Sequence, residues 1–310
     1  MIKLPFGLFR KRAQPRIAIV GTCQTGGMAA AARGMLPGAE VQSWHISVWP
    51  TDTDEEILAK MPDFDLVISQ VSDWDSRESL RISRLREMGL NVVYTPSIGF
   101  TGFHPDITYM AGPDGYIQGE GSDYHSILIA AAFVLGIPEH RVADLFNTYV
   151  FAELGYLDVF PAAKAALVDS FAAEGFEIES LFDDWLRVCG PFMYSVNHPH
   201  VHVLATITRL ALSRAGYVDA AERLPKGLDD YLSKNFTVPT YPPIAKRVGV
   251  PGSTVHNLNT HGVAPGQKRG VALGDYVSAS YRIYRDLDRD VLMTSGVAAA
   301  CERLDSLVVR

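Results

Sequence analysis

Cys23 lies where a short apolar run gives way to an alanine-rich stretch. Residues 16–20 are β-branched and closed by Gly21, which is typical of a central parallel strand, and residues 28–36 favour a helix. A thiol in such a turn lies near the N–H groups of a helix start, which lower a thiol pKa and can hold an anion. Cys23 is therefore a candidate nucleophile; its alternative role is that of a small buried apolar residue.

Two phosphate-binding motifs come close to this turn, but both are incomplete. A P-loop needs Lys and Ser or Thr after its second glycine, whereas Gly27 and Met28 follow Gly26 here. A dinucleotide-binding G-x-G-x-x-G motif would have glycine where Cys23 stands. Neither motif therefore identifies the turn as a nucleotide site.

The composition is that of an ordinary globular protein of 310 residues, with 47% hydrophobic and 20% charged residues. Lys and Arg number 28 against 35 Asp and Glu, and the formal net charge of −7 argues against general binding of nucleic acid. The odd number of cysteines, 3 in a chain of this size, favours reduced thiols and a cytoplasmic location.

Residues 1–15 are interpreted as an N-terminal tail. Within them an apolar stretch precedes basic residues, the reverse of a secretory signal, and weak association with an anionic membrane surface is an alternative to simple disorder. No run of about 18 apolar residues predicts an integral membrane segment.

The residues after the first turn alternate between strand-like and helix-like patterns. Strands are expected over residues 40–44, 65–69 and 91–95, with helices over residues 52–60 and 76–88 between them. This alternation predicts an α/β fold, a mainly parallel sheet flanked by helices in three layers with a Rossmann-like or SGNH-like start. Ligands in such sheets bind beyond the carboxyl ends of the strands, which groups Cys23, Gln70 and the segment after Pro96 at one edge.

The later half is predicted to be largely helical. Residues 97–121 should form an ordered excursion over the sheet edge, and a helix should follow with Ser122 as its N-cap and His125 in its first turn. Further helices are expected over residues 138–147, 161–173, 178–188, 199–215, 273–286 and 290–304. The expected organisation is a tail (1–15), an α/β catalytic domain (16–216) and a helical and irregular C-terminal extension packed on it (217–310).

Four short motifs occur in a fixed order along the chain: Gly21-Thr22-Cys23-Gln24, Gly102-Phe103-His104-Pro105-Asp106, Ser122-Asp123-Tyr124-His125 and Asn197-His198-Pro199. Together they resemble the WcbI family of polysaccharide-biosynthesis proteins, in which Gly-Asn-Cys-Gln is usual, so that Thr22 departs from the pattern. The resemblance extends from residue 16 to about residue 215. It implies a coenzyme A-binding acetyltransferase of capsule assembly.

Under this resemblance, Cys23, His104 and His125 are the candidate catalytic residues. Cys23 acts as a nucleophile, or it lines the thioester pocket while a histidine deprotonates the sugar hydroxyl. Pro105 pushes His104 toward an extended conformation. A helix dipole would keep His125 neutral. A hydrogen-bonded structural histidine is the alternative for both rings.

Gln24 and Gln70 are candidate ligand-binding residues, since either amide could donate to an oxyanion or to coenzyme A. Their alternative role is to close the loops at the strand ends. Asn197 and His198 precede Pro199, so they would form the cap of a helix whose N–H groups could hold a phosphate of coenzyme A. Plain capping, and a metal site formed by His198 with His202, are the alternatives; no metal is expected.

Two further groups of side chains could contact the ligands. Basic residues that could neutralise the phosphates of coenzyme A are Arg33, Arg77, Arg81, Arg209, Lys246, Arg247, Lys268 and Arg269, with surface solvation as the alternative for each. Trp44, Trp49 and Trp74 follow or lie near strand ends, where an aromatic face can stack on a sugar ring or adenine, or fill a gap under a loop.

The leading functional hypothesis is transfer of acetyl from acetyl-CoA to a hydroxyl of a capsular or other cell-surface polysaccharide or its precursor. The partners would be coenzyme A and a glycan acceptor, without nucleic acid. The alternatives are an SGNH-like esterase or thioesterase, in which water replaces the sugar, and a coenzyme A- or sugar-binding protein without turnover.

Overall fold

The computed structural model describes residues 14–46, 52–219, 223–258 and 270–308, which divide into two compact units. Unit 1 is drawn from Met1–Ser97, Ser170–Leu181 and Val201–Leu232, and unit 2 from Ile98–Asp169, Phe182–His200 and Ser233–Arg310. Three helices have residues in both units: α7 (Val159–Ala173), α8 (Glu179–Cys189) and η5 (Tyr231–Lys234). The expectations for the first dozen residues, Trp49, Lys268 and Arg269 lie outside the described residues.

Unit 1 is an α/β unit in which strands and helices alternate along the chain. Its elements are β1 (Arg16–Gly21), α1 (Thr25–Met35), β2 (Glu40–His45), α2 (Asp54–Lys60), η1 (Met61–Asp63), β3 (Leu66–Ser69), η2 (Glu78–Leu80), α3 (Ile82–Glu87), β4 (Val92–Tyr94) and α9 (Val201–Arg214). The four predicted strands are confirmed. The helix expected over residues 76–88 is shorter, because a 3-10 turn precedes α3.

The four strands form one parallel sheet in the order β2-β1-β3-β4. The chain passes from β1 to β2 on one side and then returns to β3 on the other side of β1. The point where the strand order reverses therefore lies between β1 and β3, and this is where open parallel sheets bind ligands.

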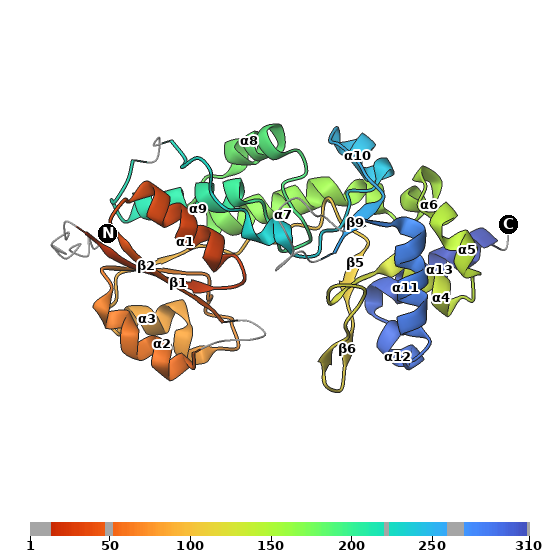
Figure 1. The fold of residues 1–310 in the computed structure, drawn as a ribbon, viewed down its shortest axis with the longest axis horizontal. Helices are drawn as coiled ribbons and strands as arrows, with labels where there is room; N and C mark the ends of the chain where they lie inside the picture. Colours follow the sequence, from red (N-terminus) through yellow and green to blue (C-terminus); the bar gives the residue numbers. More distant parts are fainter. Residues whose placement is uncertain (1–13, 47–51, 220–222, 259–269, 309–310) are drawn as a thin grey trace. The chain divides into compact units, whose positions relative to one another are not determined.

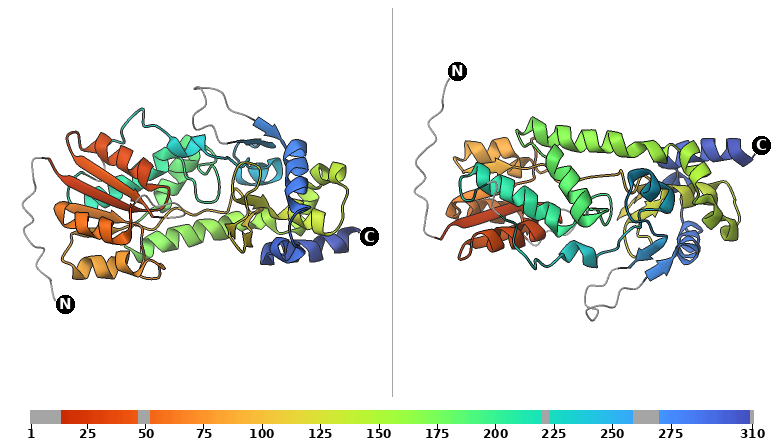
Figure 2. Two further views of the ribbon diagram at one scale, coloured as in Figure 1. Left: turned by 60° about the horizontal axis from the view of Figure 1, so that its bottom comes forward. Right: turned by 90° about the horizontal axis from the view of Figure 1, so that it is seen from above.

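Helices cover both faces of the sheet, as Figures 1 and 2 show. α2 and α3 pack on one face, where Ala18 and Val20 of β1 join a buried apolar cluster with Ile57 and Leu85. α1 and α9 cover the other face. They approach closely because Gly27 has no side chain: a Cβ there would lie 2.5 Å from Leu204 Cδ1.

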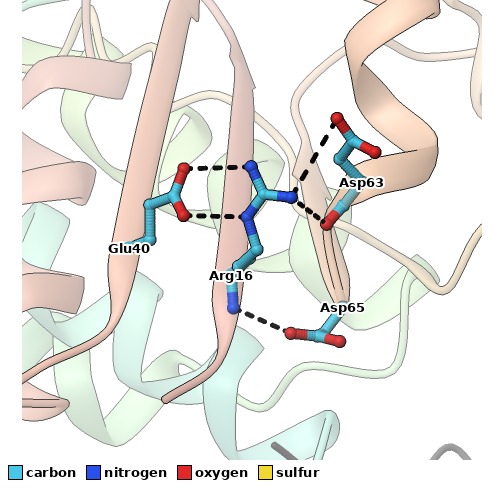
Figure 3. Close-up of polar contacts among 4 residues, drawn as sticks. All are labelled: Arg16, Glu40, Asp63 and Asp65. Atoms are coloured by element: carbon cyan, nitrogen blue, oxygen red, sulfur yellow. Dashed lines mark hydrogen bonds and ion pairs between the residues drawn. The ribbon is translucent and has the colours of Figure 1, made fainter.

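A polar cluster fixes the amino end of β1 (Figure 3). The Arg16 guanidinium donates to both carboxylate oxygens of Glu40, at 2.8 and 3.1 Å, and to the backbone carbonyl of Asp63 at 2.9 Å. The backbone N–H of Arg16 donates to Asp65 Oδ2 at 2.9 Å. Arg16 thus ties β1 to β2 and to the start of β3, at the end of the sheet opposite its ligand-binding edge.

Unit 2 is largely helical, as expected for the later half. Its elements are β5 (Ile107–Tyr109), β6 (Ala111–Gly112), β7 (Gly115–Tyr116), β8 (Tyr124–Ser126), α4 (Ile127–Val134), α5 (Glu139–Val142), η3 (Ala143–Leu145), α6 (Thr148–Glu153), η4 (Tyr156–Asp158), α10 (Pro242–Val248), β9 (Val255–Asn257), β10 (Gly270–Ala272), α11 (Leu273–Tyr284), α12 (Arg289–Leu292) and α13 (Ser295–Val308). The helix α4 is apolar on nearly all sides and packs against α11 and α13 in one buried cluster.

Two predicted helix starts are wrong. Ser122 does not cap a helix: Tyr124–Ser126 is a strand that pairs antiparallel with Ile107–Tyr109, and Ser126 caps α4. His125 therefore lies in a strand, and the helix-dipole argument for it does not apply. The helix expected from Pro199 begins at Val201, because Pro199 forms an isolated bridge with Met193.

Among the described helices, none combines the length and the apolar character that a membrane-spanning helix needs.

Candidate functional site

A pocket with both polar and apolar walls lies at the carboxyl ends of β1 and β3, where the strand order of unit 1 reverses. Its volume is about 190 Å³, and it is lined by Gly21, Thr22, Ile46, Gln70, Val71, Asp75, Ser76 and Arg77. These residues lie at or after the carboxyl ends of β1, β2 and β3. The pocket therefore occupies the position that the topology of the sheet assigns to a ligand.

Gln70 is fixed in this edge by its contact with Gly21. Its backbone N–H donates to the carbonyl of Val20 at 2.9 Å, which continues the pairing of β3 with β1. A Cβ on Gly21 would lie 2.6 Å from Gln70 Oε1, so only glycine leaves room for the amide.

The Gln70 amide ties the strand-to-helix turn together. Its Oε1 accepts from the backbone N–H of Thr22 at 3.2 Å and from the Thr22 hydroxyl at 3.0 Å. Its Nε2 donates to Gln24 Oε1 at 3.1 Å. Both glutamines are buried, so these bonds hold the turn in one geometry. The two glutamines predicted from sequence thus contact each other. Their hydrogen bonds connect the ends of β1 and β3, as expected for the alternative role of closing the loops.

Cys23 lies between Thr22 and Gln24 of this network, in the turn before α1. It is half-buried and is not part of a disulfide. The backbone N–H of Thr25 donates to the carbonyl of Thr22 at 3.1 Å, which closes the turn around the cysteine. Its backbone position is therefore set by its neighbours on both sides.

Arg77 lines the pocket and forms an ion pair with Asp54. Its Nη1 donates to Asp54 Oδ1 at 2.5 Å, and the Ser79 hydroxyl donates to the other oxygen of Asp54 at 2.6 Å. The Asp75 carboxylate accepts from the backbone N–H of Arg77 at 2.9 Å. Sequence analysis named Arg77 only as one of eight basic residues, because its pairing with Asp54 depends on the fold.

His104 is a buried neutral histidine of unit 2. Burial lowers the pKa of its imidazole to about 4, and the nearby backbone of Val238 opposes part of this change. That contact is a hydrogen bond with the Val238 backbone. At neutral pH the ring is therefore uncharged.

His125 is buried in unit 2 with both ring nitrogens engaged. Nε2 lies 3.0 Å from the carbonyl oxygen of Ile117, so it carries the proton and donates. Nδ1 then accepts from the Tyr284 hydroxyl at 3.2 Å. Burial lowers the pKa of His125, while Ile117 and Asp123 oppose the change. These contacts fit a structural histidine, the alternative considered from the sequence.

Asp106, in the motif of His104, anchors α4. Its carboxylate accepts from the Ser126 hydroxyl at 2.5 Å, the Leu128 N–H at 2.8 Å and the Tyr156 hydroxyl at 3.1 Å. Burial raises its pKa to about 7, and these hydrogen bonds oppose the rise. Asp106 and Ser126 together thus cap α4, in place of the cap predicted at Ser122.

Asn197 and His198 belong to a loop of unit 2. The Tyr124 hydroxyl donates to Asn197 Oδ1, and Ser195 Oγ lies 3.1 Å from the same oxygen. The ring of His198 packs edge-on against Tyr124, with 6.0 Å between ring centroids. Neither residue is at the N-cap position of α9, which begins at Val201.

The predicted site residues thus form separate sets. Cys23, Gln24 and Gln70 are assembled in unit 1, whereas His104, His125, Asn197 and His198 belong to unit 2. Among the described residues, no group of three or more His, Cys, Asp or Glu side chains is arranged to hold a metal ion. The sequence did not identify Tyr284 and Tyr156 as site residues, and it gave Tyr124 only as part of a motif, because each contacts its partner across a long stretch of chain.

Comparisons with known proteins give one family and one solved structure. Residues 16–219 match the sequence model of the family described as the polysaccharide biosynthesis enzyme WcbI. Among curated proteins, no sequence matches the chain. A structure of WcbI is similar with a TM-score of 0.69 and 16% identity over 94% of this chain and 99% of that one. That structure is described as the native protein without a disulfide bond between coenzyme A and a cysteine of its own.

Proposed function

The chain belongs to the WcbI family of polysaccharide biosynthesis enzymes, and from this premise we propose that it is an acetyltransferase. The proposed reaction moves acetyl from acetyl-CoA to a hydroxyl of a capsular or other cell-surface polysaccharide or its precursor, and we place it in the cytoplasm. The proposal rests on the family and on the chemistry of one turn.

The observation that carries the proposal is the position of Cys23. The thiol belongs to the turn between β1, an inner strand of the parallel sheet, and α1, at the point where the strand order reverses. Parallel sheets place their ligands at this point, and helix N–H groups favour a thiolate or a bound anion. The WcbI structure whose description pairs coenzyme A with a cysteine is consistent with a thiol near the cofactor.

Two routes fit this thiol. In the first, Cys23 Sγ attacks the thioester carbonyl, the thiolate of coenzyme A leaves, and the sugar hydroxyl then displaces the cysteine from the acetyl group. In the second, the sugar hydroxyl attacks the thioester directly and Cys23 lines the pocket. Both routes require a base for the proton of the hydroxyl and donors for the oxyanion.

The base is proposed to be one of two histidines, His104 or His125. Both rings are buried: the two ring nitrogens of His125 contact Ile117 and Tyr284, and His104 has a hydrogen bond with the Val238 backbone. The donors are proposed to come from the turn that holds Gln24. His104→Gln and His125→Gln test the two candidates: the variant of the base should lower kcat and retain the thermal shift by coenzyme A, whereas a variant that lowers only stability identifies a structural histidine.

The test measures release of coenzyme A thiol from acetyl-CoA with and without an acceptor glycan. If Cys23 is the nucleophile, Cys23→Ala should abolish glycan-dependent release and leave the thermal shift produced by coenzyme A intact; if the thiol only lines the pocket, most of the release should remain. Cys189→Ala serves as the matched control and should retain both the release and the thermal shift. Thioester hydrolysis at the same rate without glycan would instead identify a thioesterase. Binding of coenzyme A without any turnover would identify a binding protein.

A further inference from the structure

The pocket between the ends of β1 and β3 combines apolar and polar walls. Ile46 and Val71 contribute apolar surface, and Thr22, Asp75 and Arg77 contribute hydrogen-bonding groups. A sugar ring also has both apolar and hydrogen-bonding surface, since its C–H groups are apolar and its hydroxyls both donate and accept hydrogen bonds. The composition of the walls therefore suits such a ring.

The charges around the pocket are balanced. The Arg77 guanidinium is already paired with Asp54, and Asp75 adds a second carboxylate beside it. A phosphate would meet one neutralised cation and an acidic neighbour, which is unfavourable for an anion. A neutral polyhydroxyl ligand can donate to Asp75 and accept from Arg77, so it matches both groups.

The size of the pocket limits its occupant. Its volume of about 190 Å³ is smaller than the roughly 300–1,000 Å³ of pockets that hold drug-sized ligands. A single ring with its substituents is the appropriate size. A whole coenzyme A molecule is much larger.

An exposed tryptophan lies next to the pocket in sequence. Trp74 directly precedes Asp75, and 92% of it is exposed. Its turn is ordered by Ser72, whose Oγ accepts from the N–H of Trp74 at 3.3 Å and whose carbonyl accepts from the N–H of Asp75 at 3.3 Å. A large aromatic side chain that an ordered turn holds in solvent can stack on a ligand. Trp44, the other described tryptophan named from the sequence, is buried and cannot do so.

We propose that this pocket binds one neutral sugar ring of the acceptor glycan, with Asp75 and Arg77 bonding its hydroxyls and Trp74 contacting the next part of the glycan. The acceptor role of that sugar rests on the proposed function, but the binding of a sugar ring does not.

The test uses the full chain without coenzyme A and measures saturation-transfer NMR signals of four neutral probes. The probes are the methyl α-glycosides of glucose, galactose and mannose, and N-acetylglucosamine. At least one should bind wild type, and Asp75→Asn should weaken that affinity about tenfold or more, as expected for loss of a hydrogen bond to a charged group. Asn retains the acceptor for the Arg77 N–H, so the loop should keep its structure.

Two variants complete the design. Trp74→Ala removes an exposed side chain and should weaken binding of a di- or trisaccharide that contains the bound sugar, without loss of stability. Asp73→Asn is the matched control: its carboxylate accepts from the Ser83 N–H at 2.8 Å and does not line the pocket, so affinity should stay at the wild-type value.

The outcomes separate the two proposals. Equal sugar affinity in wild type and Asp75→Asn, or no binding of any probe, would overturn the sugar site even if acetyl transfer were observed. Loss of the thermal shift by coenzyme A in Asp75→Asn, with sugar binding intact, would also overturn it in favour of a cofactor subsite. Sugar binding that depends on Asp75 without acetyl transfer would support the site and contradict the proposed function.

Discussion

Gly21 and Gln70 share one small space at the edge of the sheet, where a Cβ on residue 21 would lie 2.6 Å from Gln70 Oε1 and 2.7 Å from Gln70 Cβ. The side chain that orders the turn before α1 is thus accommodated by the absence of a side chain on the neighbouring strand. The stability of this edge and the geometry around Cys23 depend on the same contact.

Gly21→Ala should therefore destabilise the protein by about 1–3 kcal/mol, because the new methyl group forces the Gln70 amide to move. Chemical denaturation measures this difference. Gly26→Ala is the control, since no atom lies within 4 Å of a Cβ at that position and alanine is the better helix former. Equal stability of Gly21→Ala and wild type would contradict the close packing.

Thr22→Val should cost about 0.5–1.5 kcal/mol, because it removes the hydroxyl that donates to Gln70 Oε1 at 3.0 Å while keeping the shape of the side chain. Thr22→Ser keeps the hydroxyl and should lose less stability. Urea denaturation of both variants checks the order, and a Ser variant weaker than the Val variant would argue against the hydrogen bond.

The three thiols should react with an alkylating agent at different rates. Cys301 should be slowest, because it is buried and burial raises its pKa, whereas Cys23 and Cys189 are half-buried. Coenzyme A should protect Cys23 and leave the rate of Cys189 unchanged. Peptide mass spectrometry measures each rate, and protection of Cys189 in place of Cys23 would place the cofactor elsewhere.

Asp106 should make stability depend on pH. Burial raises its folded-state pKa to about 7, above its ordinary value near 3.8, so the folded state binds more protons between these pH values. The stability that the protonated Asp106 carboxyl gives the folded state is complete below about pH 4. It is lost as the pH rises toward 7, by at most about 1.4 kcal/mol per pH unit. Relative to wild type, Asp106→Asn should therefore gain stability across this range.

The control for the pH measurement is Asp73→Asn. Hydrogen bonds from Ser83 lower the pKa of Asp73, so its carboxylate is ionised in both folded and unfolded states above about pH 5. The stability difference between this variant and wild type should stay constant from pH 5 to 7. A constant difference for Asp106→Asn as well would contradict a raised pKa for Asp106.

The local sequence predicted those helices and strands whose formation depends mainly on their own residues. The β-branched run that forms β1 predicted a central strand, and the order of strands and helices predicted the parallel sheet. The rule that ligands bind at the carboxyl ends of parallel strands then predicted Gln70 at the same edge of the sheet as Cys23. These predictions needed no knowledge of distant contacts.

Local sequence failed where the decisive partner comes from far along the chain. Ser122 has the residue type of an N-cap, but the start of α4 is set by Ser126 and by Asp106, which lies 20 residues before Ser126. The pairing of Arg77 with Asp54 spans 23 residues in the same way. No pattern in either segment identifies its partner, so both arrangements required the structure.

The path of the chain through its two units has a consequence for how the protein folds during translation. The chain changes unit five times, after Ser97, Asp169, Leu181, His200 and Leu232. A ribosome must therefore deliver most of the polypeptide before the first unit has all its parts, since α9 supplies one of the helices that cover its sheet. Until α9 is synthesised, one apolar face of the β1–β4 sheet is incompletely covered. We expect chaperones to bind the nascent chain most strongly in this state, because the apolar surface is exposed.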